Sequence, residues 1–165
     1  HLIEGFFYLM NYQRLSKEQL EELHEEFAKY IAALSIDRKA WDEIKANSPE
    51  QVDQHLDQFS DLVWEDVLSK DLYLEHLSPN HFFVFKCLQE EMHLIAVKLT
   101  NVEQDITTPE GWKWLLHHIH DASVTLYRST KKYEHDRKEE LYGMILKGAQ
   151  ISESDRYKSI ADFLV

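Results

Sequence analysis

The chain has 165 residues and a mass of 19.7 kDa, a length that fits one domain with a sizeable core. Hydrophobic residues make up 44% and charged residues 29% of it, which excludes a disordered chain, a collagen-like fibre and a low-complexity array. Its net charge of −12 disfavours nucleic acid and anionic membrane surfaces as partners. With 4 Gly and 3 Pro, the chain lacks the residues that tight hairpins and phosphate loops need, so its composition favours helices.

The start of the chain differs from the rest. Residues 2–10 are apolar but too few to span a bilayer, and they lack the basic start of a signal peptide. We therefore predict no secretion signal, interpret 1–9 as an extension or an expression remnant, and place a single helical domain at 10–165. The only cysteine, Cys87, excludes an internal disulfide and fits a reducing compartment, so we expect a cytoplasmic protein.

Amphipathic patterns predict three helices in the first part of the chain. Apolar residues recur at helical spacing in 17–34, directly after Ser16, which is a good N-cap residue. A second helix is predicted at 37–47. A third is predicted at 49–68 and begins at Pro49, because proline is well suited to the first helical position.

The segment 79–100 fits two structures. The runs 82–85 and 94–97 are strand-like and could pair as a hairpin. Apolar residues across the whole segment also recur at helical spacing, and no turn-forming residue separates the two runs. Since Pro79 also resembles a helix start, we favour a helix and keep a hairpin at about 82–99 as the alternative.

The remainder of the chain is predicted to be helical except for one short segment. Helices are predicted at 109–120, 131–146 and 153–164, with Thr108 and Ser152 as N-caps and Gly148 after the second of them. The segment 123–127 is a short strand or an extended link. The favoured fold class is therefore mainly α, a single compact multi-helix domain. The alternative is an α+β fold with a small hairpin at about 82–99 and a short strand at about 123–127.

Two Glu-x-x-His units are the first candidates for metal chemistry. In Glu21/His24 and Glu90/His93, a spacing of three residues places both side chains on one face of a predicted helix. Dinuclear iron and manganese sites in helix bundles use two such units. Both glutamates lie away from the apolar stripes of their predicted helices, however, so we interpret them as surface charges.

A denser cluster follows the predicted helix at 109–120. His117 and Asp121 are four residues apart, and with His120 they could bind a zinc or nickel ion. The favoured interpretation is that imidazoles near the end of a helix contact its last carbonyl groups. We therefore expect no cofactor, with a divalent metal such as iron, manganese or zinc as the alternative.

Tryptophan and cysteine positions suggest how the surface and the core are divided. Trp64 lies off the apolar stripe of its helix, and Trp112 and Trp114 cannot face the same side of one helix, so at least one tryptophan is expected to be partly exposed. Exposed tryptophan is typical of partner-binding surfaces. Cys87 lies in the most apolar stretch and is predicted to be an unreactive core residue.

From Met10 onward, the chain contains the stretches MNYQRLSKEQLEELHEEF, FSDLVWEDVLSKDLYLEHLS, EEMHLIAVKL and DITTPEGWKWL. These stretches resemble a family of uncharacterised proteins from flavobacteria and other Bacteroidota. The resemblance covers nearly the whole chain after Met10. It implies a bacterial, cytoplasmic protein and assigns no catalytic residue.

Three functions remain open from the sequence, which contains no intact catalytic motif. The leading hypothesis is a non-enzymatic helical interaction module, which binds a protein partner or associates with itself. Trp64, Trp112 and Trp114 are its candidate contact residues. The second is a metal-dependent enzyme with Glu and His ligands, and the third is a binder of a small apolar ligand in an aromatic pocket.

Overall fold

The computed structural model describes residues 12–164, so the prediction for residues 1–9 lies outside the described part. The chain divides into two compact units, His1–Val67 and Leu68–Val165. The boundary falls near the end of helix α5 (Pro49–Ser69), where no Pro, Gly or Ser-rich linker marks it in the sequence. The prediction of a single domain at 10–165 stays a prediction.

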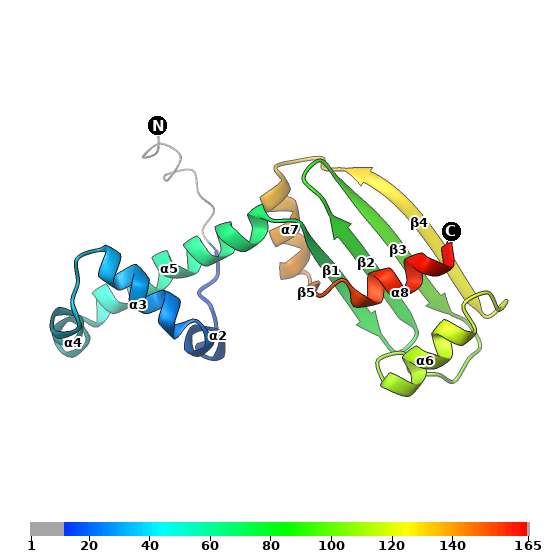
Figure 1. Ribbon diagram of the computed structural model, residues 1–165, viewed down its shortest axis with the longest axis horizontal. Helices are drawn as coiled ribbons and strands as arrows, with labels where there is room; N and C mark the ends of the chain where they lie inside the picture. Colours follow the sequence, from blue (N-terminus) through cyan, green and yellow to red (C-terminus); the bar gives the residue numbers. More distant parts are fainter. Residues whose placement is uncertain (1–11, 165) are drawn as a thin grey trace. The chain divides into compact units, whose positions relative to one another are not determined.

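The first unit is helical, as the sequence predicted. Its helices are α2 (Lys17–Glu22), α3 (His24–Ala33), α4 (Arg38–Asn47) and α5 (Figure 1). The predicted cap at Ser16 is confirmed, because its hydroxyl accepts a hydrogen bond from Gln19 N while the Gln19 side chain accepts one from Ser16 N. The predicted helix at 17–34 is interrupted at Leu23, which separates α2 from α3.

Aromatic rings form the centre of this helical unit. Phe27 lies edge-on to Phe59 and to Trp41, with ring centroids 5.1 and 5.5 Å apart. Tyr30 and His55 extend the cluster. Edge-on ring pairs are favourable beyond the area they bury, so this cluster stabilises the packing of α3, α4 and α5.

The second unit contains a five-stranded antiparallel sheet with the strand order β4-β3-β2-β1-β5. Its strands are β1 (Leu72–Ser78), β2 (His81–Cys87), β3 (Glu91–Leu99), β4 (Val124–Lys132) and β5 (Gln150–Ser152) (Figure 1). The described residues thus form an α+β fold, and the favoured prediction of a mainly α fold is wrong. The alternative placed a hairpin and a short strand near β2, β3 and β4 but missed β1 and β5.

The error arose because apolar residues lie on both sides of β2 and β3. Phe82 and Val84 face one side and Phe83 and Phe85 the other, so the period-two alternation of a strand is hidden and a helical spacing fits by coincidence. Pro79 lies in the turn between β1 and β2 and does not start a helix.

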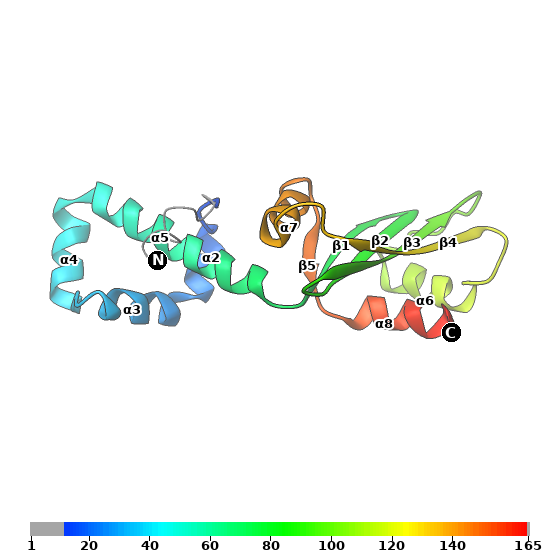
Figure 2. The ribbon, with the colours of Figure 1, turned by 90° about the horizontal axis from the view of Figure 1, so that it is seen from above.

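Two helices cover one face of the sheet. These are α6 (Pro109–His117) and α8 (Asp155–Ala161), which is followed by a 3-10 turn at Asp162–Leu164. Figure 2 shows both on the same side of the sheet, with α7 (Arg137–Leu146) on the opposite side. The core beneath α6 and α8 includes Phe82, Val84, Ile95, Val97, Leu115 and Ile160.

The predicted ends of these helices are partly confirmed. Thr108 caps α6, since its hydroxyl accepts a hydrogen bond from Gly111 N at 3.0 Å. Gly148 follows α7 with a φ of +110°, a conformation that favours glycine. Two predictions are wrong: Ser152 is in β5 and does not cap a helix, and the segment 131–132 belongs to β4, so α7 begins only at Arg137.

Candidate functional site

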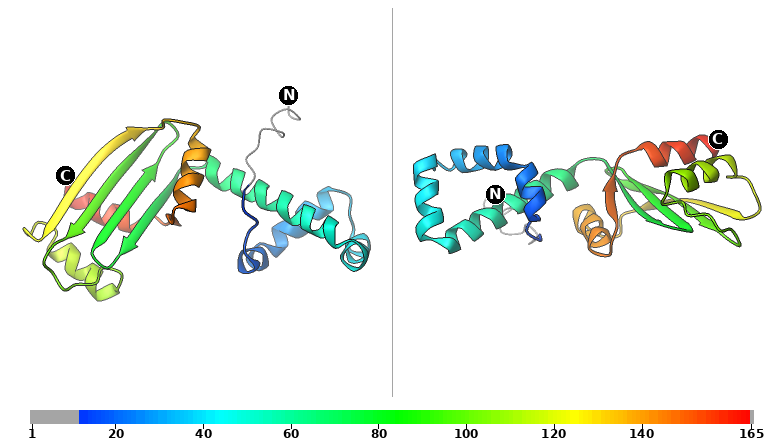
Figure 3. Two further views of the ribbon diagram at one scale, coloured as in Figure 1. Left: turned by 180° about the vertical axis from the view of Figure 1, so that it is seen from behind. Right: turned by 90° about the horizontal axis from the view of Figure 1, so that it is seen from below.

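The face of the sheet opposite α6 and α8 carries two rows of mostly apolar side chains, which we call the open sheet face. Figure 3 shows this side from behind, with α7 only at the end near the start of β1. Strand register gives the first row as His76, Phe83, Ala96 and Tyr127. The neighbouring row crosses all five strands and consists of Ile151, Leu74, Phe85, Leu94 and Ser129. Phe83 is 37% exposed and Tyr127 59% exposed.

The strand residues on this side of the sheet include two lysines, of which Lys131 lies 3.6 Å from Glu134 and 3.7 Å from Glu140. Because successive strand residues point to opposite faces, Lys98 and Lys131 belong to the side of the open sheet face. By the same alternation, Glu75 and Glu91 point to the other side. No Asp or Glu of strands β1 to β5 therefore lies on the open sheet face. The combination of exposed apolar rings and basic neighbours is suited to contact with an acidic protein surface.

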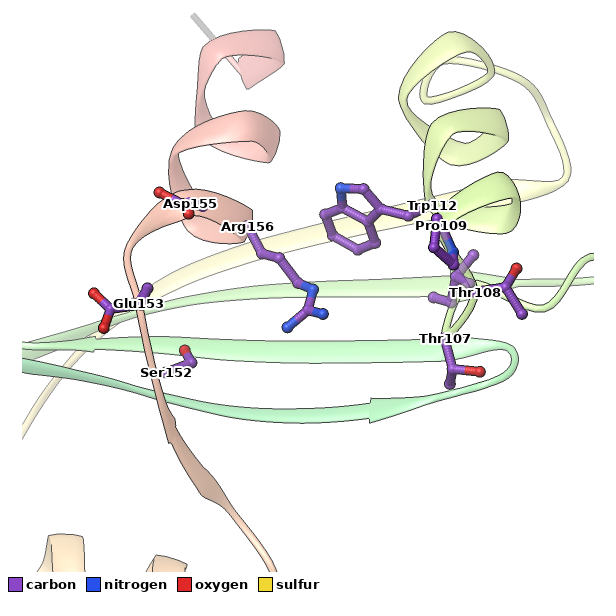
Figure 4. A pocket seen from close by; sticks show the side chains of 9 residues that line it. Thr107, Thr108, Pro109, Trp112, Ser152, Glu153, Asp155 and Arg156 are labelled. Atoms are coloured by element: carbon purple, nitrogen blue, oxygen red, sulfur yellow. The ribbon is translucent and has the colours of Figure 1, made fainter. Parts of the chain in front are cut away.

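A pocket opens on the other side, between the starts of α6 and α8 and the end of β5 (Figure 4). It has a volume of about 450 Å³, and its wall includes Trp112, Ser152 and Arg156. A second pocket of about 260 Å³, which includes Glu75, shares Thr107 and Arg156 with the first. We call the two adjoining pockets together the Glu75 pocket.

The Glu75 pocket contains an ion pair in which the Glu75 carboxylate is buried and the Arg156 side chain is 43% exposed. Glu75 is 6% exposed, and its Oε1 accepts a hydrogen bond from Arg156 Nη1. The Arg156 guanidinium also lies 5.7 Å from the centroid of the Trp112 ring. Glu75 Oε2 and Ser152 Oγ are buried and have no hydrogen-bond partner in the described part of the chain. Such atoms are rare in folded proteins, so they mark this pocket as a candidate ligand site.

A separate pocket of about 330 Å³ lies in the helical unit. Its wall is mostly apolar and includes Phe27, Ile31 and Trp41, with His24 at one side. This aromatic pocket is the kind of site that the hypothesis of a small apolar ligand requires. In contrast to the Glu75 pocket, its walls contain no buried polar atom that lacks a partner among the described residues.

The two Glu-x-x-His units do not share the helical geometry that was predicted for them. Glu21 is exposed on α2, and the Nδ1 atom of His24 lies 2.8 Å from the Glu21 carbonyl oxygen. Glu90 lies in the turn between β2 and β3, so the helical interpretation of Glu90/His93 is wrong. His93 instead contacts Glu91, with Nε2 3.0 Å from Oε2.

Two histidines at the end of α6, His117 and His118, follow the favoured interpretation, since Nδ1 of His118 lies 2.7 Å from the Trp114 carbonyl oxygen. Nδ1 of His117 lies 2.8 Å from the Lys113 carbonyl oxygen, so this imidazole contacts one of the last carbonyls of the helix. Because α6 ends at His117, Asp121 is not on the same helical face. His120 packs edge-on against Phe163. Within residues 12–164, no three His, Cys, Asp or Glu side chains are placed to hold one metal ion.

The three tryptophans named as contact residues are all half-buried, which confirms that at least one is partly exposed. Trp64 donates a hydrogen bond to the Gln13 carbonyl oxygen at 3.1 Å. Trp114 stacks on His118 with ring centroids 4.3 Å apart. Only Trp112 lines the Glu75 pocket. Their predicted role as partner contacts stays a prediction.

Cys87 is a core residue, as predicted. It is fully buried, and burial raises the pKa of its thiol to about 12. We expect iodoacetamide to leave native Cys87 unmodified at about pH 8 and to alkylate it completely in guanidinium chloride, as measured by intact-protein mass spectrometry. Equal rates of alkylation with and without denaturant would contradict the buried position.

Neither the Glu75 pocket nor the open sheet face has a direct signal in the sequence. Both depend on the strand assignment of the segment around Glu75, because only a strand places this residue on the core side between Tyr73 and Leu77. A charged residue at a core-facing position would have been the available clue.

In the described part of the chain, no helix has the length and apolar composition that crossing a membrane would require.

Residues 10–165 match a protein family described as a family of unknown function (DUF6495). The chain belongs to this family. The predicted membership of an uncharacterised family is thus confirmed, whereas its restriction to Bacteroidota stays a prediction. No curated protein and no solved structure matches the chain. The family assigns no residue a role, so the function must be argued from the sites themselves.

Proposed function

We propose that this protein is a non-enzymatic interaction module whose α+β unit binds a partner protein on the open sheet face. The observation that carries the proposal is the exposure of Phe83 and Tyr127 in one row across the sheet, on a side that lacks acidic strand residues. Large rings exposed together are unusual on a surface that faces only water, and aromatic residues are enriched at the centres of interfaces.

The charges indicate which kind of partner fits. Lys98 flanks the two rows at one side, and Lys131, which also contacts Glu134 and Glu140, flanks them at the other. An apolar segment with acidic residues near Lys98 is therefore complementary to this surface. A symmetric contact between two copies through this face would place the same apolar rows and the same lysines on both sides, with no acidic strand residue to meet them. We therefore favour an acidic, amphipathic segment of a different protein over self-association.

The test uses two synthetic helical peptides that differ only in charge. Both carry Leu at positions i, i+3, i+4 and i+7, and one has Glu where the other has Lys. We expect the Glu peptide to bind, and Tyr127→Asp to weaken this binding at least about ten-fold, as measured by fluorescence anisotropy at low salt. Phe163→Asp is the matched control, because Phe163 is an exposed ring outside the open sheet face.

Two results would count against the proposal. Equal binding of the Glu and Lys peptides would show that the charge of the face does not select the partner. If light scattering instead shows a dimer that Tyr127→Asp converts to a monomer, the face is occupied by a second copy of the chain and the proposed acidic partner is wrong.

A further inference from the structure

The Glu75 pocket has a polar floor that the proposed interaction does not use. Arg156 and Trp112 face the middle of the pocket, whereas Glu153 and Asp155 extend away from the guanidinium (Figure 4). The groups that a ligand would meet are therefore Glu75, Arg156 and Ser152, together with the Trp112 ring. Their chemistry indicates what this pocket can bind.

Glu75 requires a hydrogen-bond donor. An ionised carboxylate accepts several hydrogen bonds, yet only Oε1 is engaged, by Arg156. Glu75 Oε2 is buried and has no partner among the described residues, and the same holds for Ser152 Oγ in the wall of the adjoining pocket. A ligand that supplies N–H groups here would satisfy a carboxylate that the described residues leave half-satisfied.

Arg156 requires an acceptor. One guanidinium nitrogen, Nη1, is bonded to Glu75, and the described residues give Nε and Nη2 no further hydrogen bond. The Trp112 ring beneath the guanidinium limits its orientation. A held guanidinium with two free donors on one edge is the arrangement that binds a carboxylate through two bonds.

The two requirements must be met by one small molecule, because Glu75 and Arg156 are in direct contact. A simple anion would be repelled by the Glu75 carboxylate, and a simple cation would be repelled by the Arg156 guanidinium. An α-amino acid carries an ammonium and a carboxylate on the same carbon and has no net charge. Ile106, Pro109 and Trp112 form an apolar part of the wall beside these groups.

We propose that the Glu75 pocket binds a free α-amino acid with an apolar side chain as its zwitterion. The ligand ammonium donates to Glu75 Oε2 and Ser152 Oγ, the ligand carboxylate accepts from Arg156, and the side chain packs on Ile106, Pro109 and Trp112. The site is independent of the open sheet face, so either proposal can fail without the other.

The experiment titrates the full chain with L-leucine, N-acetyl-L-leucine and L-leucinamide. The second ligand lacks the ammonium and the third lacks the carboxylate. We expect L-leucine to bind with a Kd of about 1 mM or tighter, and each derivative to bind at least about ten-fold more weakly. Calorimetry gives the affinities, and the shift of the Trp112 indole N–H signal in NMR spectra places the ligand in the pocket.

Two variants separate binding from folding. Ser152→Ala removes an unpaired buried hydroxyl, so its melting temperature without ligand is expected to equal or exceed that of the wild type while its affinity for L-leucine falls about three-fold to ten-fold. Glu75→Gln is expected to abolish binding. Its matched control is Glu91→Gln, another strand glutamate, which contacts His93 outside the pocket.

The proposal is supported only if the affinities depend on both ligand charges and on both variants. No binding of L-leucine up to about 20 mM would overturn it. Binding of N-acetyl-L-leucine as tight as that of L-leucine would also overturn it, because Glu75 would then have no role as the acceptor. A shift of the Trp112 signal that persists in both Glu75→Gln and Ser152→Ala has the same consequence.

Discussion

Gly111→Ala is expected to destabilise the α+β unit by about 3 kcal/mol or more, one of the largest effects of any single methyl group in this chain. A Cβ atom at this position would lie 1.7 Å from the carbonyl oxygen of Asp105, inside any possible contact distance. Backbone atoms cannot rotate away as a side chain could, so the loop before α6 would have to move.

The loop that Gly111 contacts has little freedom to move. Asp105 accepts hydrogen bonds from Thr107 N and from the Thr107 hydroxyl, and these bonds lower the pKa of the Asp105 carboxyl, so it is ionised at neutral pH. The Asp105 carbonyl oxygen also accepts a hydrogen bond from the Thr108 hydroxyl at 2.8 Å. A shift of this loop would break the cap of α6 as well.

Gly143→Ala is the matched control for this prediction. Gly143 lies within α7, and a Cβ atom there would have no neighbour within 4 Å. Alanine is the better helix former, so this substitution is expected to stabilise the chain by about 0.5–1 kcal/mol. Urea unfolding of both variants, followed by circular dichroism, measures the two effects. If Gly111→Ala lowers the free energy of unfolding by less than about 1 kcal/mol, the loop before α6 can move to make room for the added methyl group.

The helical parts of the fold could be predicted because their signals are local. Ser16 and Thr108 cap helices through hydroxyl groups that bond backbone N–H groups three residues later, and both were found from the sequence. The glycine after α7 was found for a similar reason, since Gly148 adopts a conformation that other residues avoid. None of these assignments needs a contact with a distant part of the chain.

The sheet could not be predicted in the same way because its signals are not local. β1 pairs with β5, and Glu75 lies opposite Gln150, which is far away in the sequence. The segment that forms β1 mixes polar and apolar residues, and β5 has only three residues. Both candidate sites are built on this sheet, and they were missed for the same reason.

Removal of the Arg137 side chain is expected to lower the free energy of unfolding of the α+β unit more than removal of any other Lys or Arg side chain on its surface. It begins α7, and its guanidinium donates hydrogen bonds to the carbonyl oxygens of Leu68, Lys70, Cys87 and Leu88. Two of these carbonyls lie at the end of α5 and in the link to β1, and the other two lie at the end of β2 and in the turn after it. One guanidinium therefore holds together three stretches of chain that the sheet alone does not join.

The surroundings of Arg137 strengthen this arrangement. The Tyr133 ring lies 5.8 Å from the guanidinium carbon, and the Tyr133 hydroxyl donates to the Leu88 carbonyl oxygen. Burial raises the pKa of the Tyr133 hydroxyl, which therefore stays protonated and keeps donating at neutral pH. Water can replace the guanidinium at these carbonyls only in part, because the site is half-buried.

Arg137→Met keeps much of the side-chain volume but removes all of these donors, and we expect it to destabilise the α+β unit by about 3 kcal/mol. Arg137→Lys should lose about half as much, since one ammonium cannot reach carbonyls that lie around a planar fork. Arg128→Met is the control: Arg128 is exposed and makes one long hydrogen bond, to the Leu164 carbonyl oxygen at 3.3 Å, so a change within about 0.5 kcal/mol is expected. Urea unfolding measures the loss of unfolding free energy in each variant. Equal losses for Arg137→Met and Arg128→Met would mean that the four hydrogen bonds to carbonyl oxygens contribute no net stability. Strand pairing alone would then hold the start of β1 in place.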